Sequence, residues 1–262
     1  MSNPKNRTKL ILIGAIFPIL IICVWEILVK IDVLPKQSIA APSQAFIEFW
    51  ELLSTEYLWR NIGYSIYRLF AGFILGSMAG IILGWFVGYN KLGSKLLEPS
   101  FLTFIQVPPI AWIPFLIALF GIGDISKILL ISIGAFTVLF ISTSEGVRNT
   151  DQKLLEMASV FNKTKKEITR SVVFPSVLKY ILGNLRIAIA LSFTLLLAAE
   201  MINASSGLGW LINDARRFSR APEMIVGILV IGILGKSIDF LIVKISSYIL
   251  RWDNSLRTEN QY

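Results

Sequence analysis

Two ionisable side chains stand alone in a long apolar run, and they have the clearest potential for chemistry. Arg186 and Glu200 both fall in the run of about residues 178–201. At about 1.5 Å per helical residue they would lie about 21 Å apart on one helix, so they cannot pair directly. A charge facing lipid is costly, so each is expected to face the bundle interior, water or a different helix. We therefore predict that both line or gate a polar pathway.

Arg186 is open to two interpretations. It would favour an anionic solute in the inner half of such a pathway, or it would only cap backbone carbonyls of a neighbouring helix. Lys236 and Asp239 are three residues apart, and we expect them to neutralise each other.

Enzymatic chemistry finds little support in this composition. The chain has no histidine, and its single cysteine, Cys23, lies within an apolar run. These counts weaken metal sites and acid–base catalysis and exclude an internal disulfide. The segment from Gly88 to Lys95 only resembles a phosphate-binding loop, because its Ser and Lys stand in the wrong order. We therefore expect no catalytic residue, no metal and no cofactor bound by this chain.

The composition predicts an all-α integral membrane protein. Of 262 residues, 55% are hydrophobic and 16% charged, with a mean hydropathy of +0.68. Six apolar runs reach the roughly 20 residues that a membrane-spanning helix needs: about 10–29, 62–88, 101–120, 126–147, 178–201 and 224–250. The first is too long for a signal peptide and lacks a cleavage site.

The distribution of Lys and Arg predicts that both termini are cytoplasmic. With the N-terminus inside, fourteen of these residues lie in cytoplasmic segments and seven in external ones. The net charge of +8 then follows from topology and requires no nucleic acid. We divide the chain into three parts. Residues 1–61 contain the first span and an external amphipathic segment, and residues 62–252 form the core with a cytoplasmic loop at 149–175. Residues 253–262 form a cytoplasmic tail.

Two segments predict specific helix packing. Residues 41–61 form an amphipathic pattern, read either as a helix along the membrane surface or as one packed against the bundle. The second span carries glycines at strict four-residue spacing, which favours close packing of a neighbouring helix, with a sliding contact used in gating as the other interpretation. These are Gly72, Gly76, Gly80, Gly84 and Gly88.

A pathway is predicted where the third and fifth spans meet. Prolines interrupt the third span. Irregular backbone is tolerated at membrane depth only against protein or a water-filled cavity, which favours a helix that lines a pathway. The alternative is a structural kink with no role in a pathway. The connection 205–223 begins with a flexible Gly-Leu-Gly and would be a gate, a docking lip or an ordinary surface loop. The candidate pathway and gate residues are Gln106, Pro108, Pro109, Trp112, Arg186, Ser192, Glu200, Gly207 and Gly209.

The basic loop 149–175 is predicted to form two short helices. Asn149 or Thr150 would cap the first, whose apolar face comprises Leu154, Leu155, Ala158 and Phe161. Asn162 would end it in the left-handed conformation, and Thr164 with Glu167 would start the second as a capping box. Pro175 would exclude Phe174 from the helix and open the next span.

This loop resembles the signature of permease subunits of bacterial ABC importers. The family signature is E-A-A, then three residues, then G, then nine residues, then I-x-L-P. The corresponding segments here are EMASVFN and VVFP, in which Glu156, Ala158 and Pro175 match the signature. Met157, Asn162, Val172 and Phe174 depart from it. The segments 65–73, 107–123 and 183–212 are similar to the nitrate, sulfonate and taurine branch, which also has relatives for thiamine-precursor pyrimidines.

The resemblance implies the architecture of type I importers. It implies a homodimer of six-span subunits in a bacterial cytoplasmic membrane, two cytoplasmic ATPase subunits that hold ATP and Mg²⁺, and an external substrate-binding protein. The loop would seat in the ATPase through Glu156, Met157, Ala158, Phe161, Asn162, Glu167 and Pro175. An ion-gradient transporter would need its own coupling charges, and a membrane enzyme a nucleophile or metal cluster at bilayer depth. Both stay as alternatives, and the solute is left open.

Overall fold

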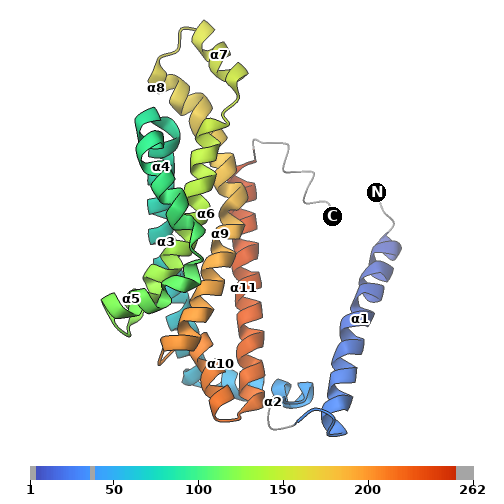
Figure 1. The fold of residues 1–262 in the computed structure, drawn as a ribbon. Helices are drawn as coiled ribbons and strands as arrows, with labels where there is room; N and C mark the ends of the chain where they lie inside the picture. Colours follow the sequence, from blue (N-terminus) through green and yellow to red (C-terminus); the bar gives the residue numbers. More distant parts are fainter. Residues whose placement is uncertain (1–3, 36–38, 252–262) are drawn as a thin grey trace.

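The computed structural model describes residues 4–35 and 39–251, and every regular element in them is a helix (Figure 1). The predicted tail, 253–262, lies outside this range. The helices are α1 (Pro4–Lys30), α2 (Pro42–Leu53), α3 (Glu56–Tyr89), α4 (Lys91–Gln106), η1 (Pro109–Trp112), α5 (Ile113–Phe120), α6 (Asp124–Arg148), α7 (Gln152–Val160), α8 (Lys165–Ile168), η2 (Thr169–Val173), α9 (Phe174–Asn203), α10 (Leu208–Arg217) and α11 (Ala221–Ile249).

Four of the described helices are long and apolar enough to cross a membrane. They are Glu56–Tyr89, Asp124–Arg148, the continuous helix Lys165–Ile202, and Ala221–Ile249. A fifth candidate is the pair Lys91–Gln106 and Pro109–Phe120, which passes the same test together but bends by 88°. The prediction of an all-helical protein with several apolar spans is therefore confirmed.

The third span differs from the predicted 101–120. Its first helix begins at Lys91, before the predicted start of the span, and ends at Gln106. Pro108 and Pro109 then break the helix, because neither has a backbone N–H and each disfavours helix for the residue before it. Val107 is accordingly extended, with φ −75° and ψ 119°.

The glycine ridge lies at the contact between α3 and α6, the central packing of the bundle. Gly72, Gly76, Gly80 and Gly84 are buried. A methyl group on Gly76 would overlap the backbone carbonyl of Ser132, and one on Gly84 would approach the carbonyl oxygen of Phe140 within 2.6 Å. The spacing thus lets two backbones approach closely within one chain, as small residues do between membrane helices.

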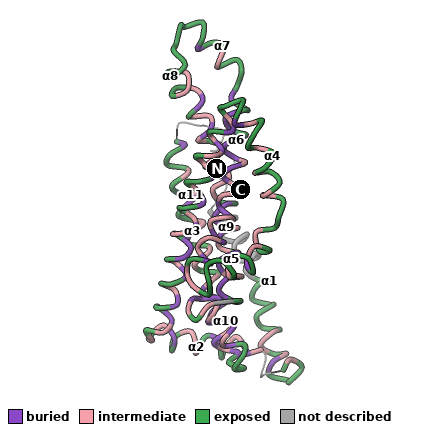
Figure 2. The backbone as a smooth tube through the Cα atoms, turned by 60° about the vertical axis from the view of Figure 1, so that its left-hand side comes forward, coloured by how far each residue is buried: buried purple, intermediate pink, exposed green. Residues whose placement is uncertain are grey.

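Helix α6 lies between α3 and α9, and α11 covers α9 (Figure 1). The core shared by these helices includes Leu69, Ile131, Leu196 and Ile238. Figure 2 shows buried positions along α6 and more exposed ones on the outer helices.

The predicted amphipathic helix 41–61 is wrong as a single element. It breaks at Ser54 and Thr55, where Thr55 is extended, and its second half is the start of α3. Ala45 and Leu52 on α2 are buried against α11 and α3, whereas Phe46 and Trp50 are exposed. One face of α2 therefore packs against the bundle.

Helix α1 stands apart from the bundle and approaches the rest of the chain near its C-terminal end, beside α2 (Figure 1). Trp25 packs against the cluster of Ala40, Ala45 and Ile225, and Glu26 accepts hydrogen bonds from the backbone and hydroxyl of Ser43. The helices α7 and α8 project at one end of the molecule, which we call the loop end; α2 and α10 lie at the opposite end, the cleft end (Figure 1).

Candidate functional site

The loop end begins with a short helix whose cap differs from the prediction. The carboxylate of Asp151 accepts a hydrogen bond from the backbone N–H of Lys153 at 2.9 Å, so Asp151 caps α7. The prediction of Asn149 or Thr150 is wrong. The Thr150 hydroxyl donates instead to the carbonyls of Gly146 and Val147, the end of the preceding helix.

The turn between α7 and α8 has the predicted geometry. Asn162 has φ 52°, a left-handed conformation that ends α7. The Thr164 hydroxyl accepts from the N–H of Glu167 at 3.3 Å, and the Glu167 carboxylate accepts from the N–H of Thr164 at 2.7 Å. Both predictions, the left-handed asparagine and the capping box, are confirmed.

The predicted helix end at Phe174 is wrong. Phe174 is helical, with φ −58° and ψ −47°, and α8, η2 and α9 follow one another without a break. The N–H of Phe174 donates to the carbonyl of Thr169, five residues back, and this wider turn carries the helix across Pro175. Pro175 lies in the first turn of α9, directly after this π-helical turn.

The predicted apolar face of α7 is split between two directions. Leu155 packs against Val147 and Val173, and Ala158 is buried within the chain, so Ala158 faces its own protein. The exposed apolar side chains are Leu154, Met157, Val160 and Phe161. Figure 2 shows α7 as a mostly exposed segment. Glu156 is exposed beside them and accepts a bond from Gln152 at 3.3 Å.

The cleft end contains a buried polar network centred on Arg68. Its guanidinium donates to the carboxylate of Glu200 at 2.9 Å and to that of Asp124 at 2.8 Å. It also donates to the carbonyl and hydroxyl of Ser206, at 2.7 and 2.8 Å. The Arg68 and Glu200 side chains are 3% and 0% exposed. The network joins α3, α6 and α9 to the connection that leads into α10.

The same carboxylate holds the start of α10. Glu200 accepts from the backbone N–H of Gly209 at 2.9 Å, and the Ser65 hydroxyl donates to Glu200 while accepting from the N–H of Leu208. Gly207 has φ 110° and lies directly against the Glu200 carboxylate, so a side chain there would meet both strain and overlap. Glu200, Gly207 and Gly209, three predicted gate residues, therefore form one site.

Sequence reasoning missed the cation that completes this site. Arg68 lies inside the second apolar run, and the criterion applied to Arg186 would have selected it equally well. Ser65 and Asn61, whose side-chain oxygen accepts from the N–H of Gly207 at 2.7 Å, carry no comparable signal.

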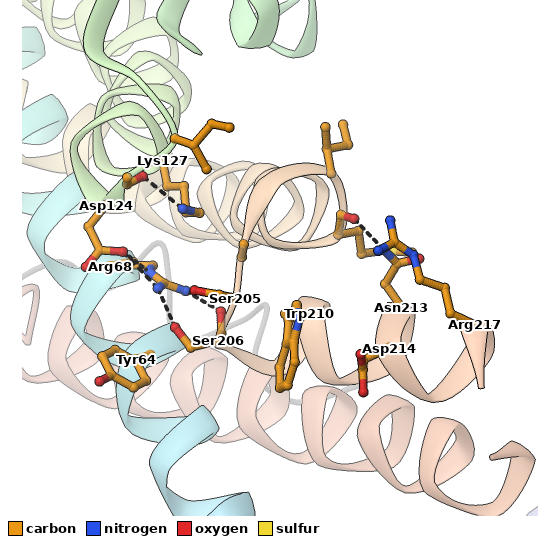
Figure 3. Close-up of a pocket in the computed structure, with 15 residues that line it drawn as sticks. Tyr64, Arg68, Asp124, Lys127, Ser205, Ser206, Trp210, Asn213, Asp214 and Arg217 are labelled. Atoms are coloured by element: carbon orange, nitrogen blue, oxygen red, sulfur yellow. Dashed lines mark hydrogen bonds and ion pairs between the residues drawn. The ribbon is translucent and has the colours of Figure 1, made fainter. Parts of the chain in front are cut away.

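A cleft of ≈ 450 Å³ opens beside this network (Figure 3). Tyr64, Arg68, Asp124 and Lys127 line it from α3 and α6, and Ser206, Trp210, Asn213, Asp214 and Arg217 line it from α10 and the connection before it. Lys127 is buried and donates to the carbonyl of Gly123 at 2.8 Å. Neither Lys127 nor Arg217 forms an ion pair within the described residues, whereas Asp124 pairs with Arg68 and Asp214 with Arg220.

The other predicted pathway residues do not join this site. Arg186 is paired with Asp239 of α11 through two bonds of 2.6 and 3.0 Å, so the interpretation of an isolated charge or carbonyl cap is wrong. Asp239 contacts Lys236 only at 3.5 Å, so its main partner is Arg186. Ser192 is buried and donates to the carbonyl of Ile131 at 3.4 Å, between α9 and α6.

The residues of the broken span lie at the bend between α4 and α5. Gln106 and Pro108 are exposed, and Pro109 begins η1. The Trp112 ring packs against Phe104 and Phe115, with centroids 4.9 and 5.7 Å apart. The structure thus separates the predicted pathway set into four places: the bend, the contact between α9 and α11 at Arg186, the contact between α9 and α6 at Ser192, and the cleft-end network.

Comparison with known proteins agrees with this architecture. Residues 72–250 match the family model described as the inner membrane component of binding-protein-dependent transport systems. A protein of Bacillus subtilis named an aliphatic sulfonates transport permease is 33% identical over 92% of this chain and 88% of its own length. A protein of Leptolyngbya laminosa named a nitrate import permease is 29% identical over 87% of this chain and 83% of its own.

A solved structure shows the same fold. A chain of the MetNI methionine ABC transporter, in an inward-facing conformation, superposes with a TM-score of 0.61 at 20% identity, covering 74% of this chain and 96% of the other. The ion-gradient and enzyme alternatives receive no comparable support. The chain is therefore a multi-pass membrane protein of the binding-protein-dependent transport permease family, in its nitrate and sulfonate branch.

Proposed function

We propose that this chain is the permease subunit of an ATP-driven importer for a small anionic solute, with two copies forming the pathway. Each copy would have six spans: the four long apolar helices, the bent pair of α4 and α5, and α1. Both termini would lie on the cytoplasmic side of a bacterial inner membrane. Two separate ATPase subunits would hold ATP and Mg²⁺ at the loop end. An external binding protein would deliver the solute at the cleft end.

The observation that carries this proposal is the exposure of apolar side chains on α7. Met157 and Phe161 are 57% and 73% exposed on a helix that projects beyond the bundle (Figure 1). Apolar anchors surrounded by polar residues are typical of protein contacts. Glu156 adjoins them and offers a charge for a basic partner residue. The buried face of α7, at Leu155 and Ala158, connects the contact to the ends of α6 and α9.

The coupling role can be tested by replacing the exposed anchors. Met157→Ser with Phe161→Ser, or Glu156→Lys alone, is expected to reduce both ATPase binding and uptake, because apolar contact or charge complementarity is lost. The control is Phe46→Ser, which removes an exposed aromatic side chain of α2 at the cleft end of the molecule. Unchanged ATPase binding in all loop variants would refute the assignment.

The anionic class of solute rests on the charges of the cleft. Its two acidic side chains are already ion-paired, whereas Lys127 and Arg217 form no ion pair within the described residues. The cleft therefore has an excess of positive charge. The sulfonate and nitrate named for the two relatives are anions, which agrees with this excess of positive charge. A neutral pyrimidine would not require unpaired cations in the cleft.

Uptake kinetics distinguish the two solute classes. We expect Lys127→Gln and Arg217→Gln to raise the KM for uptake of sulfonates or nitrate without changing the affinity of the binding protein. Arg216→Gln removes the same charge one residue away, outside the cleft lining, and serves as the matched control. Equal effects of Arg216→Gln and Arg217→Gln, or faster uptake of a pyrimidine than of any anion, would contradict an anionic solute.

A further inference from the structure

A second groove lies at the loop end, apart from the cleft and from the exposed face of α7. It has a volume of ≈ 570 Å³ and lies between the end of α3 and the start of α9. We call it the aromatic–basic groove and define it by Trp85, Tyr89, Phe174, Lys165, Lys166 and Arg170.

The floor of this groove is aromatic. The rings of Trp85 and Tyr89 stack with centroids 6.4 Å apart and an interplanar angle of 11°, and the ring of Phe174 lies 6.3 Å from Trp85. The Tyr89 hydroxyl is 3.1 Å from the Thr169 hydroxyl and ties α3 to the π-helical turn η2. Tyr89 and Phe174 nevertheless stay about half exposed. Nothing in the described residues covers them.

The rim of the groove is cationic and unneutralised. Lys165, Lys166 and Arg170 are exposed, and none forms an ion pair within the described part of the chain. The acidic residue among them, Glu167, is held by Thr164 in the capping box. Three cations beside an aromatic floor fit a ligand that carries a negative group and an apolar body.

An exposed apolar strip continues from the groove along α3. Tyr89, Phe86, Ile82, Met78 and Leu75 follow at intervals of three or four residues and are all exposed. This spacing places them on one side of a helix long and apolar enough to cross a membrane. The strip distinguishes a lipid from the ATPase, because a protein at the loop end would not extend along the span.

We propose that the aromatic–basic groove binds the phosphate headgroup of an anionic phospholipid, whose acyl chains lie along the strip on α3. Lys165, Lys166 and Arg170 bind the phosphate, and Trp85 and Tyr89 lie at headgroup level, as aromatic residues do at membrane interfaces. Clusters of Lys and Arg at the cytoplasmic end of a span attract anionic lipids by the same charge complementarity. The site is independent of the transported solute.

Lipid retention by the intact importer complex tests this site. The complex is reconstituted in nanodiscs of phosphatidylcholine with phosphatidylglycerol, extracted in mild detergent, and its bound lipids are counted by native mass spectrometry. The variant Lys165→Gln, Lys166→Gln, Arg170→Gln is expected to retain roughly tenfold less phosphatidylglycerol, with phosphatidylcholine unchanged. The matched control, Lys91→Gln, Lys95→Gln, Lys153→Gln, removes three exposed cations of the loop end from outside the groove.

The possible results distinguish a phospholipid in the groove from a free phosphate compound and from the ATPase. Competition by millimolar glycerol phosphate that fully displaces phosphatidylglycerol would show a site for free phosphates and overturn the proposal. Equal loss in the control variant would show a diffuse charge effect. Loss of ATPase subunits from the groove variant, with lipid retention intact, would assign the groove to the ATPase. Trp85→Ala provides a second variant that changes no charge. Unchanged retention of phosphatidylglycerol in both this variant and the triple variant would also refute the site.

Discussion

Arg68 on α3 donates to Glu200 on α9 at 2.9 Å, with both side chains almost completely buried at the cleft end. Glu200 in turn accepts from the N–H of Gly209. The pair therefore connects two spans to the first turn of α10, and α10 lines the cleft. A movement of α9 relative to α3 would therefore disturb the residues that line the cleft.

Removing one partner of this pair should be strongly destabilising. We expect Arg68→Ala to lower the free energy of unfolding by about 3–5 kcal/mol, because it leaves a buried carboxylate without its cation. Glu200→Gln should cost less, since the amide oxygen can still accept from Gly209. Titration of the detergent-purified chain with a denaturing detergent measures both. Equal and small effects of the two variants would show that the charge pair is unimportant.

The glycine ridge predicts a position-dependent effect of one methyl group. Gly76→Ala should cost about 1–3 kcal/mol, because the methyl overlaps the Ser132 carbonyl and α3 must move away from α6. Gly63→Ala, on the same helix with no atom within 4 Å of the new methyl, should be neutral or slightly stabilising. Thermal unfolding of the two variants makes the comparison, and similar midpoints would refute close packing at Gly76.

The left-handed turn at the loop end predicts a preference for glycine over alanine. With φ 52° at position 162, Asn162→Gly should leave coupling and stability unchanged, whereas Asn162→Ala should cost about 1–2 kcal/mol locally. Limited proteolysis of the α7–α8 segment reports on this local stability. Faster cleavage of the glycine variant than of the alanine variant would contradict the prediction.

The pair of Arg186 and Asp239 joins two spans, α9 and α11. Because an unpaired charge in a span is costly, Arg186→Ala is expected to lower the unfolding midpoint by removing the main partner of Asp239. Exchanging the two residues, Arg186→Asp with Asp239→Arg, should restore the wild-type unfolding midpoint and uptake. An exchange that restores neither would mean that the two side chains do not act as a pair.

The loop end could be predicted in detail because its features are local. The capping box of Thr164 and Glu167 and the left-handed Asn162 depend on residues three or four positions apart. The glycine ridge could likewise be read from the period of one helix, and the break at Pro108 and Pro109 from the missing backbone donors. Such features need no knowledge of distant segments. Two predictions failed at the loop end. The cap of α7 was wrong because neighbouring candidates compete and the end of α6 takes the Thr150 hydroxyl. The helix end at Phe174 was wrong because a π-helical turn carries the helix across Pro175.

The cleft end shows what the sequence alone does not determine. Arg68 and Glu200 are separated by 132 positions, and no local rule states which carboxylate a buried guanidinium will meet. Arg186 was predicted as an isolated charge, and only the position of α11 shows that Asp239 is its partner. The hydrophobic pattern determined that spans exist and which residues are costly to bury. Only the packing of α3, α6, α9 and α11 decided their partners, because a charge in an apolar environment is satisfied by whichever opposite charge the tertiary fold brings within bonding distance.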